Sequence, residues 1–279
     1  MLILARGPEE IVAREQIATE DPGLTLAAIE QVLGGWQAEH HFAALGIGSF
    51  GPLDLDPTSP EFGRMTSTPK PGWAGAPVLA RLSQAAGVAT SIDTDVNGAA
   101  LAEMRWGSGR GMEDFAYITV GTGVGVGLVA NGQPTRGFAH CELGHIRPHR
   151  LAGDDWPGSC PFHGDCVEGL AAGPSLIDRV GAERVKSLSP DDPVWESVAW
   201  TLAQLCQSIV CAAAPRAIAI GGGVVGNNPH LLPRVETMLA ESLNGYMPLP
   251  ANGPYVRAPD LGDDAGPMGA IALAMGVRR

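Results

Sequence analysis

Residues 115–130 read FAYITVGTGVGVGLVA, which is an apolar run, a cluster of glycines and a second apolar run. The pattern predicts strands at Phe115–Val120 and Gly127–Ala130, joined by a glycine turn that exposes backbone N–H groups and the Thr122 hydroxyl to an anion. The turn leads into a strand and not a helix, and the chain contains no G-x-x-x-x-G-K-[ST]. It is therefore neither a Walker loop nor a Rossmann fingerprint. A plain glycine-rich hairpin is the alternative.

Strands and helices alternate on both sides of this hairpin, which is typical of an α/β protein. Upstream, the sequence predicts strands at Leu2–Ala5, Ile11–Ile17, Ala44–Ser49 and Ala89–Ile92, and helices at Asp21–Trp36 and Pro77–Ala86. Downstream, it predicts a helix at Pro190–Ala213, a strand at Ala217–Ile220, and helices at Pro229–Leu243 and Gly266–Met275.

The helix expected at Asp21–Trp36 has a recognisable start. Asp21 is suited to cap its first turn, and Pro22 is suited to its first position. The residues expected on its buried face are Leu24, Ala27, Ala28, Val32 and Leu33.

The composition excludes several classes of protein. The 279 residues are 45% hydrophobic and 17% charged, which supplies enough apolar surface for two folded domains and argues against disorder. No run of about eighteen apolar residues occurs, so we expect no membrane span and predict a cytoplasmic protein. The net charge is −12, and Lys70 and Lys186 are the only lysines. This balance argues against nucleic-acid binding by a basic patch.

A metal site is predicted at CPFHGDC, residues 160–166. The spacing C-x2-H-x2-C lets one short loop present Cys160, His163 and Cys166 to a single ion. His145 follows a glycine that permits close approach, and we expect it to be the fourth ligand. Four protein ligands leave no open position, so the predicted zinc is structural. The alternative is a disulfide or two buried thiols, and an odd total of five cysteines in a cytosolic chain disfavours the disulfide.

The other nearby thiols and imidazoles have weaker claims. Cys206 and Cys211 lie in the long predicted helix and are expected to be core thiols. Cys141 lies outside the ligand spacing, and His140 and His149 are poorer candidates for the fourth ligand than His145.

A second glycine cluster follows a later apolar run, in IAIGGGV at residues 218–224. A strand there would open into Gly221 and Gly222 before the next helix, and a nucleotide could lie across them. Glycine at a strand end also serves helix packing alone, which is the alternative.

An acid–base candidate lies in SIDTDVNG, residues 91–98, where a predicted strand ends and a helix of small residues begins. Open α/β sheets bind ligands at such strand ends. Asp95 is the candidate general base, since it could accept a proton from a sugar hydroxyl that attacks phosphorus, while Asn97 orients the substrate or caps the helix. The alternative is that Asp93 or Asp95 is only a helix N-cap.

Taken together, these motifs resemble the ROK (repressor, open reading frame, kinase) family, most closely its bacterial fructokinase branch, across nearly the whole chain. The histidine inside CPFHGDC is similar to that branch and differs from the cysteine-richer loops of glucokinases and repressors. The resemblance rests on ELGH at 142–145, CPFHGDCVEG at 160–169 and DTDVN at 93–97, with support from residues 46–52, 67–73 and 264–266.

The resemblance implies the two-lobed actin-like ATPase (ribonuclease H-like) fold with an inserted structural zinc loop, and with sugar and ATP in the cleft between the lobes. It implies ATP-dependent phosphorylation of fructose to fructose 6-phosphate, with Mg²⁺ accompanying ATP. The implied small lobe is residues 1–98 with 265–279 packing back on it, and the large lobe is residues 99–264 with its zinc loop at 140–170. A homodimer is the family expectation.

The resemblance also implies roles for individual residues. Asp95 matches the catalytic base, and Asn97 lies in the same substrate motif. The other implied sugar contacts are Glu142, His145, Glu168, Pro71, Gly72 and Trp73. The implied nucleotide contacts are Gly121, Thr122, Gly123, Gly221 and Gly222, and the implied metal ligands are His145, Cys160, His163 and Cys166.

The sequence shows no match to one element of the family pattern. Members of the family begin with a strand and a Gly-Gly-Thr-Lys-like turn that contacts phosphate, and we expect this chain to begin at the second strand. The alternative functions are a catalytically weak or inactive sugar-binding or sensor protein of the same fold, and a glucokinase- or mannokinase-type hexokinase. The sequence offers no helix-turn-helix arm, which argues against a DNA-binding repressor.

Overall fold

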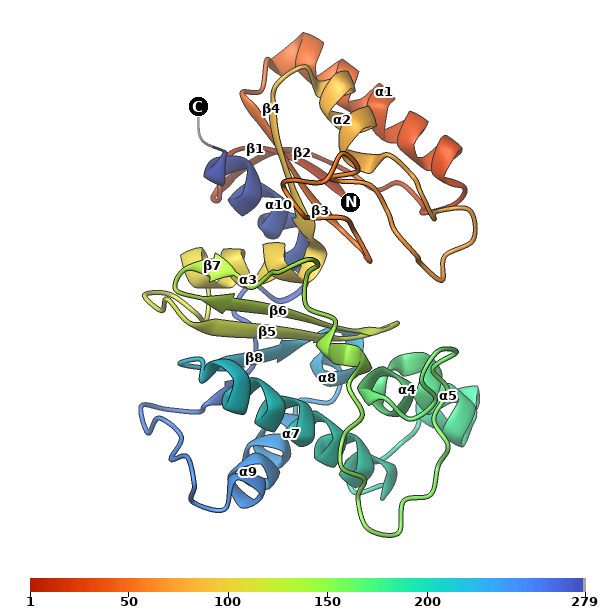
Figure 1. Ribbon diagram of the computed structural model, residues 1–279, viewed down its shortest axis with the longest axis vertical. Coiled ribbons are helices and arrows are strands. Elements are labelled where there is room, and N and C mark those ends of the chain that lie inside the picture. The colour runs from red at the N-terminus through yellow and green to blue at the C-terminus, as the bar shows by residue number, and fades with distance from the viewer. Residues whose placement is uncertain (278–279) are drawn as a thin grey trace. The chain divides into compact units, whose positions relative to one another are not determined.

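A computed structural model describes residues 1–277, which divide into two compact units (Figure 1). Unit 1 contains Met1–Trp106, Thr135–His140 and the C-terminal segment from Asp264. Unit 2 contains Gly107–Pro134 and Cys141–Asp263. The sequence-based boundary between residues 98 and 99 falls inside a helix that lies wholly in unit 1.

Unit 1 contains two small sheets. Strands β1 (Leu2–Gly7) and β2 (Glu10–Glu15) form an antiparallel hairpin in which Leu2 faces Glu15. Strands β3 (Ala44–Ser49) and β4 (Ala89–Thr94) pair in parallel, from Ala44 opposite Ala89 to Ser49 opposite Thr94. The predicted strands of this half of the chain are therefore confirmed, with boundaries that differ by a few residues.

Helix α1 (Pro22–His40) begins as predicted, because Asp21 Oδ1 accepts a hydrogen bond from Gly23 N at 2.8 Å. Its predicted buried face is only partly correct, because Leu33 is buried as predicted but Leu24 is not. Leu24 is 65% exposed, whereas Leu26 and Leu33 are buried and join the core that includes α2 (Val78–Ala86). Leu26 takes the buried position expected for Leu24, because it lies seven residues, about two helical turns, before Leu33 and so shares its side of the helix.

Helices α3 (Asp95–Trp106) and α10 (Ala265–Gly276) cross in close contact. A Cβ atom placed on Gly269 would lie 2.5 Å from the carbonyl carbon of Gly98. Strand β3 approaches α10 just as closely, because a Cβ on Gly46 would lie 1.9 Å from the carbonyl oxygen of Ala270. Glycine is needed at both positions, since any side chain would push the two backbones apart.

Unit 2 is built on a five-stranded sheet of order β7-β6-β5-β8-β9. Strands β5 and β6 are antiparallel, while β5, β8 and β9 are parallel. Strand β6 begins three residues earlier than predicted, because Val124 already pairs with Val120 across a three-residue turn. The bounds are β5 Phe115–Val120, β6 Val124–Ala130, β7 Gln133–Pro134, β8 Ile218–Gly221 and β9 Val256–Arg257.

Two long helices of unit 2, α7 (Val194–Ala213) and α9 (Leu231–Leu243), pack against each other and contribute to the core beside the sheet. Cys206 is buried in this core as predicted, whereas Cys211 is exposed, contrary to prediction. The shorter helices are α4 Val167–Ala171, α5 Gly173–Val180, α6 Ala182–Val185 and α8 Gly223–Gly226, with 3-10 turns η1 Leu143–His145 and η2 Gly262–Asp264.

Among residues 1–277, no helix has both the length and the apolar character that crossing a membrane requires.

The contact between α3 and α10 predicts that alanine substitutions at two glycines of α10 have different effects on stability. Gly269→Ala should lower the free energy of unfolding by about 1–3 kcal/mol, because the added methyl group meets the backbone of α3. Gly266→Ala is the matched control, since its Cβ would meet no atom within 4 Å and alanine favours the helix. Urea unfolding of both variants measures the difference, and equal midpoints would contradict the close packing.

Candidate functional site

The end of β4 and the start of α3 are joined by a buried carboxylate. Asp93 is 1% exposed, and its Oδ1 accepts hydrogen bonds from Thr94 N and Asn97 Nδ2, each at 2.7 Å. Its other oxygen, Oδ2, forms an ion pair with Arg136. Thr94 Oγ1 accepts a hydrogen bond from Asn97 N at 3.1 Å and so caps the first turn of α3. Asp93 is thus a structural anchor of this junction.

Asp95 is the first residue of α3 and is exposed. Its Oδ1 accepts a hydrogen bond from the backbone N–H of Val96 at 2.9 Å. The positive end of the helix favours a carboxylate in this position. An exposed carboxylate at the end of a strand has the accessibility that a general base needs.

The loop predicted to contact a sugar is anchored by its tryptophan. Trp73 is 4% exposed, its indole N–H donates to the carbonyl of Glu20 at 2.8 Å, and its ring packs edge-on against Phe50. Pro71 and Gly72 are exposed. The Trp73 side chain therefore belongs to the core of unit 1, and the part of the loop open to a ligand is Pro71 and Gly72.

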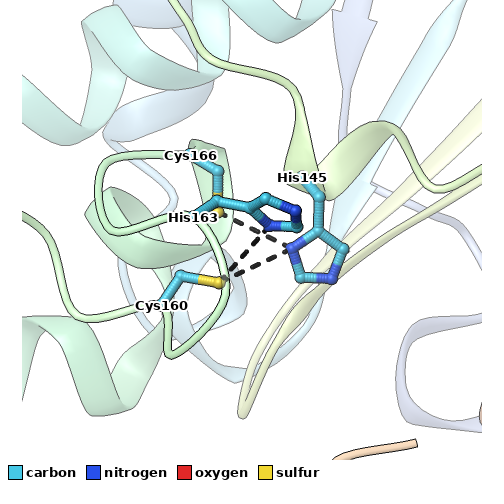
Figure 2. A group of neighbouring side chains, drawn as sticks. All are labelled: His145, Cys160, His163 and Cys166. Atoms are coloured by element: carbon cyan, nitrogen blue, oxygen red, sulfur yellow. Dashed lines mark hydrogen bonds between the residues drawn. The ribbon is translucent and has the colours of Figure 1, made fainter. Parts of the chain in front are cut away.

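In unit 2, His145, Cys160, His163 and Cys166 converge, and we refer to them as the four-ligand cluster (Figure 2). Their ligand atoms all lie within 4.8 Å of one another. Cys160 Sγ lies 3.8 Å from His145 Nδ1 and 3.7 Å from His163 Nδ1, and Cys166 Sγ lies 3.6 Å from His145 Nδ1. The structure thus brings together all four residues predicted to bind a metal.

The separations in the four-ligand cluster fit zinc. With Zn–S bonds of about 2.3 Å and Zn–N bonds of about 2.0–2.1 Å, a tetrahedron has S···N edges of roughly 3.6 Å. The three S···N distances of 3.6–3.8 Å are close to that value. Burial raises the pKa of the Cys166 thiol to about 11 in the absence of a metal, which is the ordinary response of a thiol removed from water.

Backbone hydrogen bonds shape the loop that carries three of these ligands. Cys160 N donates to Gly164 O at 3.2 Å and Gly164 N donates to Cys160 O at 2.9 Å. Gly164 has a positive φ of 63°, which favours glycine. Cys166 is the N-cap of α4, and its sulfur accepts from Gly169 N at 3.5 Å. Cys166 therefore connects the loop directly to a helix.

The competing ligands lie elsewhere. His140 is buried in unit 1, where its Nε2 accepts a hydrogen bond from Leu53 N at 3.0 Å. His149 is exposed and packs against Trp200. The preference for His145 as the fourth member of the cluster agrees with these positions.

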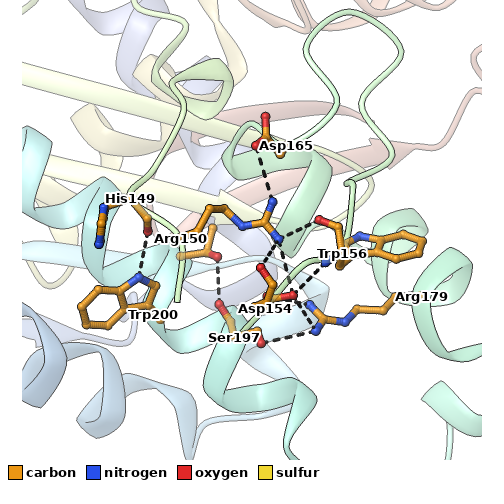
Figure 3. Close-up of polar contacts among 9 residues, drawn as sticks. His149, Arg150, Asp154, Trp156, Asp165, Arg179, Ser197 and Trp200 are labelled. Atoms are coloured by element: carbon orange, nitrogen blue, oxygen red, sulfur yellow. Dashed lines mark hydrogen bonds and ion pairs between the residues drawn. The ribbon is translucent and has the colours of Figure 1, made fainter. Parts of the chain in front are cut away.

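Charged side chains hold the chain between the ligands (Figure 3). The Asp154 side chain is 7% exposed and pairs with Arg179 at 3.0 Å and with Arg150 at 3.4 Å. Arg150 also donates to the carbonyl of Trp156 at 2.6 Å and pairs with Asp165 of the CPFHGDC loop at 3.4 Å. The network ties this loop to α5, which carries Arg179.

The two predicted nucleotide turns lie beside each other at the carboxyl ends of β5 and β8. In the first turn, Gly121 N donates to Gly123 O at 2.9 Å, and Thr122 is exposed. In the second, Gly222 has a φ of 84°, and a Cβ there would lie 2.6 Å from Val120 N. Gly221 faces Thr119 in the parallel register of β5 and β8.

The predicted site residues fall into two groups. Asp95, Asn97 and the loop Pro71–Trp73 belong to unit 1. Glu142 is exposed just before η1, and Glu168 is half-buried in α4. With the four-ligand cluster and both glycine turns, these two glutamates belong to unit 2.

Two features of the site were missed by sequence reasoning. Arg136 pairs with Asp93 across 43 residues, and Arg179 pairs with Asp154 across 25. Such pairs have no local spacing that could identify them. Neither Asp93 nor Asp95, the two residues considered as the helix cap, accepts the Asn97 N–H, since the capping hydroxyl is that of Thr94.

Comparison with known proteins gives concordant matches. The sequence model of the ROK family matches residues 1–277. The chain is 38% identical over 274 residues to a fructokinase of Pediococcus pentosaceus, covering 98% of this chain and 93% of that protein. It is 39% identical over 283 residues to a fructokinase of Zymomonas mobilis, covering 99% of this chain and 92% of that protein.

A solved structure agrees with the sequence matches. The ROK hexokinase from Thermus thermophilus superposes with a TM-score of 0.74 at 26% identity, covering 95% of this chain and 91% of that one. The predicted fold class, the actin-like ATPase fold, is thereby confirmed.

The network around Asp154 predicts a pH-dependent loss of stability. Burial alone would raise the pKa of Asp154, but hydrogen bonds from Arg179 and Trp156 N hold that pKa below its ordinary value. Asp154→Asn should lower the free energy of unfolding by about 2 kcal/mol at pH 7. The difference in free energy of unfolding between the wild type and Asp154→Asn is present above the ordinary pKa of aspartate. It is lost as the pH falls below about 4 towards the lower folded-state pKa.

Urea unfolding at a series of pH values measures this difference. The control is Asp191→Asn, because Asp191 is 94% exposed and its contact with Arg234 is long, at 3.5 Å; it should change stability little. Equal stability of Asp154→Asn and wild type at pH 7 would show that the network does not stabilise the loop.

Proposed function

Because the chain belongs to the ROK family over residues 1–277, we propose that it transfers the γ-phosphoryl group of ATP to fructose and releases fructose 6-phosphate and ADP. The observation that carries this proposal is the 38–39% identity to two fructokinases over nearly the whole chain. The fructokinase-like histidine within CPFHGDC supports the same substrate class.

Asp95 is the proposed general base. The attacking hydroxyl oxygen of fructose forms a bond to the γ-phosphorus, its proton passes to the Asp95 carboxylate, and the bond from phosphorus to the β–γ bridging oxygen breaks. The position of Asp95 at an exposed helix start supports this role. Asn97 is buried and donates to Asp93, so we assign it the orientation of this junction and of the sugar-binding face.

We assign sugar recognition to residues from several loops. Glu142, His145 and Glu168 are proposed to contact sugar hydroxyls, since carboxylates accept hydrogen bonds from hydroxyl groups and an imidazole that binds metal through Nδ1 donates its Nε2–H to a hydroxyl oxygen. In unit 1, Pro71 and Gly72 are the exposed part of the loop proposed to close over the sugar, and Trp73 anchors that loop.

We assign nucleotide recognition to the two glycine turns. Gly121, Thr122 and Gly123 are proposed to hold phosphate through backbone N–H groups and the Thr122 hydroxyl, and Gly221 and Gly222 to lie on the adenosine side. Mg²⁺ bound to the ATP phosphates would neutralise the charge that develops during transfer.

Zinc is the proposed occupant of the four-ligand cluster. Four ligands complete a tetrahedron and leave no position for water, so the ion would shape the loop and take no part in the chemistry. His145 lies in η1, and Cys166 directly precedes α4. Zinc bound to both residues would therefore hold η1 and α4 in a fixed arrangement.

The kinase proposal predicts fructose-dependent release of ADP that requires Asp95. Asp95→Asn should lower kcat by about 10²- to 10⁴-fold, because the amide cannot accept the hydroxyl proton. Coupled ADP assays with fructose, glucose and mannose measure the rate and the preferred hexose. Asp178→Asn, an exposed substitution in α5, should leave the rate unchanged.

The same assay separates the alternatives. Faster turnover of glucose or mannose would identify a different hexokinase. If no sugar produces ADP above the rate of Asp95→Asn, while calorimetry detects fructose binding without nucleotide binding, the protein is a sugar sensor and the kinase proposal is wrong.

The zinc proposal predicts about one zinc per chain in purified protein. Cys166→Ala should reduce that content to near zero, because it removes a buried ligand that also caps α4. Cys211→Ser is the matched control, since Cys211 is exposed and lies outside the cluster. Metal analysis by mass spectrometry measures both, and zinc-free wild-type protein would refute the assignment.

A further inference from the structure

The Gly121–Gly123 turn is enclosed by the segments that carry the four-ligand cluster. Gly144 immediately precedes the ligand His145, and a Cβ on Gly144 would lie 1.9 Å from the carbonyl oxygen of Val124. The 3-10 turn η1 is therefore seated directly on the first residue after the glycine turn. Because no atom could be inserted at this contact, a shift of η1 must also move the start of β6.

Glu168 contacts Val124, the first residue after the same glycine turn. Its Oε2 accepts a hydrogen bond from Val124 N at 3.0 Å. A Cβ on Gly123 would lie only 2.6 Å from that oxygen. The carboxylate thus lies against the turn and binds the first N–H group beyond it.

The first residue of the turn, Gly121, also contacts the segment that follows Cys166. Gly173 N, at the start of α5, donates to Gly121 O at 2.8 Å. Both ends of the glycine turn therefore contact residues that lie within seven positions of Cys166. Within the turn, Gly121 N donates to Gly123 O at 2.9 Å, and glycines lose much conformational freedom when they are ordered.

The position of Glu168 in α4 depends on Cys166, which caps that helix. Cys166 Sγ accepts from Gly169 N, and Val167 N donates to Ile146 O at 3.0 Å, beside the ligand His145. The Glu168 carbonyl accepts from Ser175 Oγ at 2.8 Å. The first turn of α4 is thus fixed by both segments that supply ligands.

We propose that the four-ligand cluster controls nucleotide affinity through Glu168, which is a positioning residue for the Gly121–Gly123 turn. This inference rests on the proposed function of that turn in binding nucleotide phosphate. The ordered cluster fixes α4, α4 presents Glu168 to Val124 N, and the turn keeps the shape that receives phosphate. Loss of the metal loosens α4 and weakens nucleotide binding even when no sugar is present.

The coupling must be reciprocal. If metal binding raises the affinity for nucleotide by a given factor, nucleotide raises the affinity for the metal by the same factor. A coupling on the order of ten-fold is the expected size. Mg·ADP should therefore protect the bound zinc from a competing chelator in the absence of any sugar.

The test is calorimetric titration of zinc-loaded protein with Mg·ADP without sugar. Glu168→Ala should raise the Kd for ADP by about ten-fold while zinc stays near one per chain. Glu168→Gln should restore most of the affinity, because its amide oxygen can accept from Val124 N. Glu183→Ala is the matched control, since Glu183 is 89% exposed and pairs only locally with Lys186.

The outcomes separate the two proposals. Wild-type affinity for ADP in zinc-loaded Glu168→Ala overturns the coupling and leaves the kinase proposal standing. No ADP binding by the zinc-loaded wild type overturns both.

A second measurement covers the case in which Glu168→Ala fails to fold. The colorimetric chelator 4-(2-pyridylazo)resorcinol extracts zinc from wild-type protein with and without Mg·ADP. Reduced extraction with ADP supports the coupling, and equal extraction overturns it.

Discussion

Close approach of backbones, with no room for a side chain between them, is the constraint on which both units depend. In unit 1 it sets the distance between α3 and α10 at Gly269, and so the position of the helix that begins with Asp95. In unit 2 it seats η1 on β6 at Gly144 and the second glycine turn on β5 at Gly222. A contact between backbones is stiff, because neither partner has a rotamer with which to adjust.

The segment between η1 and α4 is stabilised in a different way. Among residues 147–165, Cys160 is the one hydrophobic residue that is buried, and Phe162 is 65% exposed. Ion pairs around Asp154 and the four-ligand cluster take the place of a hydrophobic core. Small structures with little apolar burial are commonly stabilised by a metal, which is the role we propose for zinc here. The fold of this segment therefore depends on its ion pairs and its ligand residues more than on apolar burial.

Much of the fold and the complete four-ligand cluster could be predicted from sequence, because both depend on local patterns. Apolar runs gave β5 and β8, the Asp21 and Pro22 pair marked the start of α1, and the C-x2-H-x2-C spacing identified three ligands. The buried face of α1, the burial of Trp73 and the pairs made by Arg136 and Arg179 depend on residues distant in sequence. The roles of Asp95, Glu142 and Glu168 stay predictions, since they concern ligands.

The chain passes between the units four times, and this order constrains synthesis on the ribosome. Unit 1 needs α10, which packs against α3 but follows it by about 160 residues of translation. At roughly 5–20 residues per second, the nascent small unit waits on the order of 10–30 s for its last helix. During that interval the glycine surfaces of α3 and β3 lack their partner. Unit 2 is complete at Asp263, before α10 of unit 1 has been synthesised, so unit 2 can form before unit 1 although it begins later in the chain.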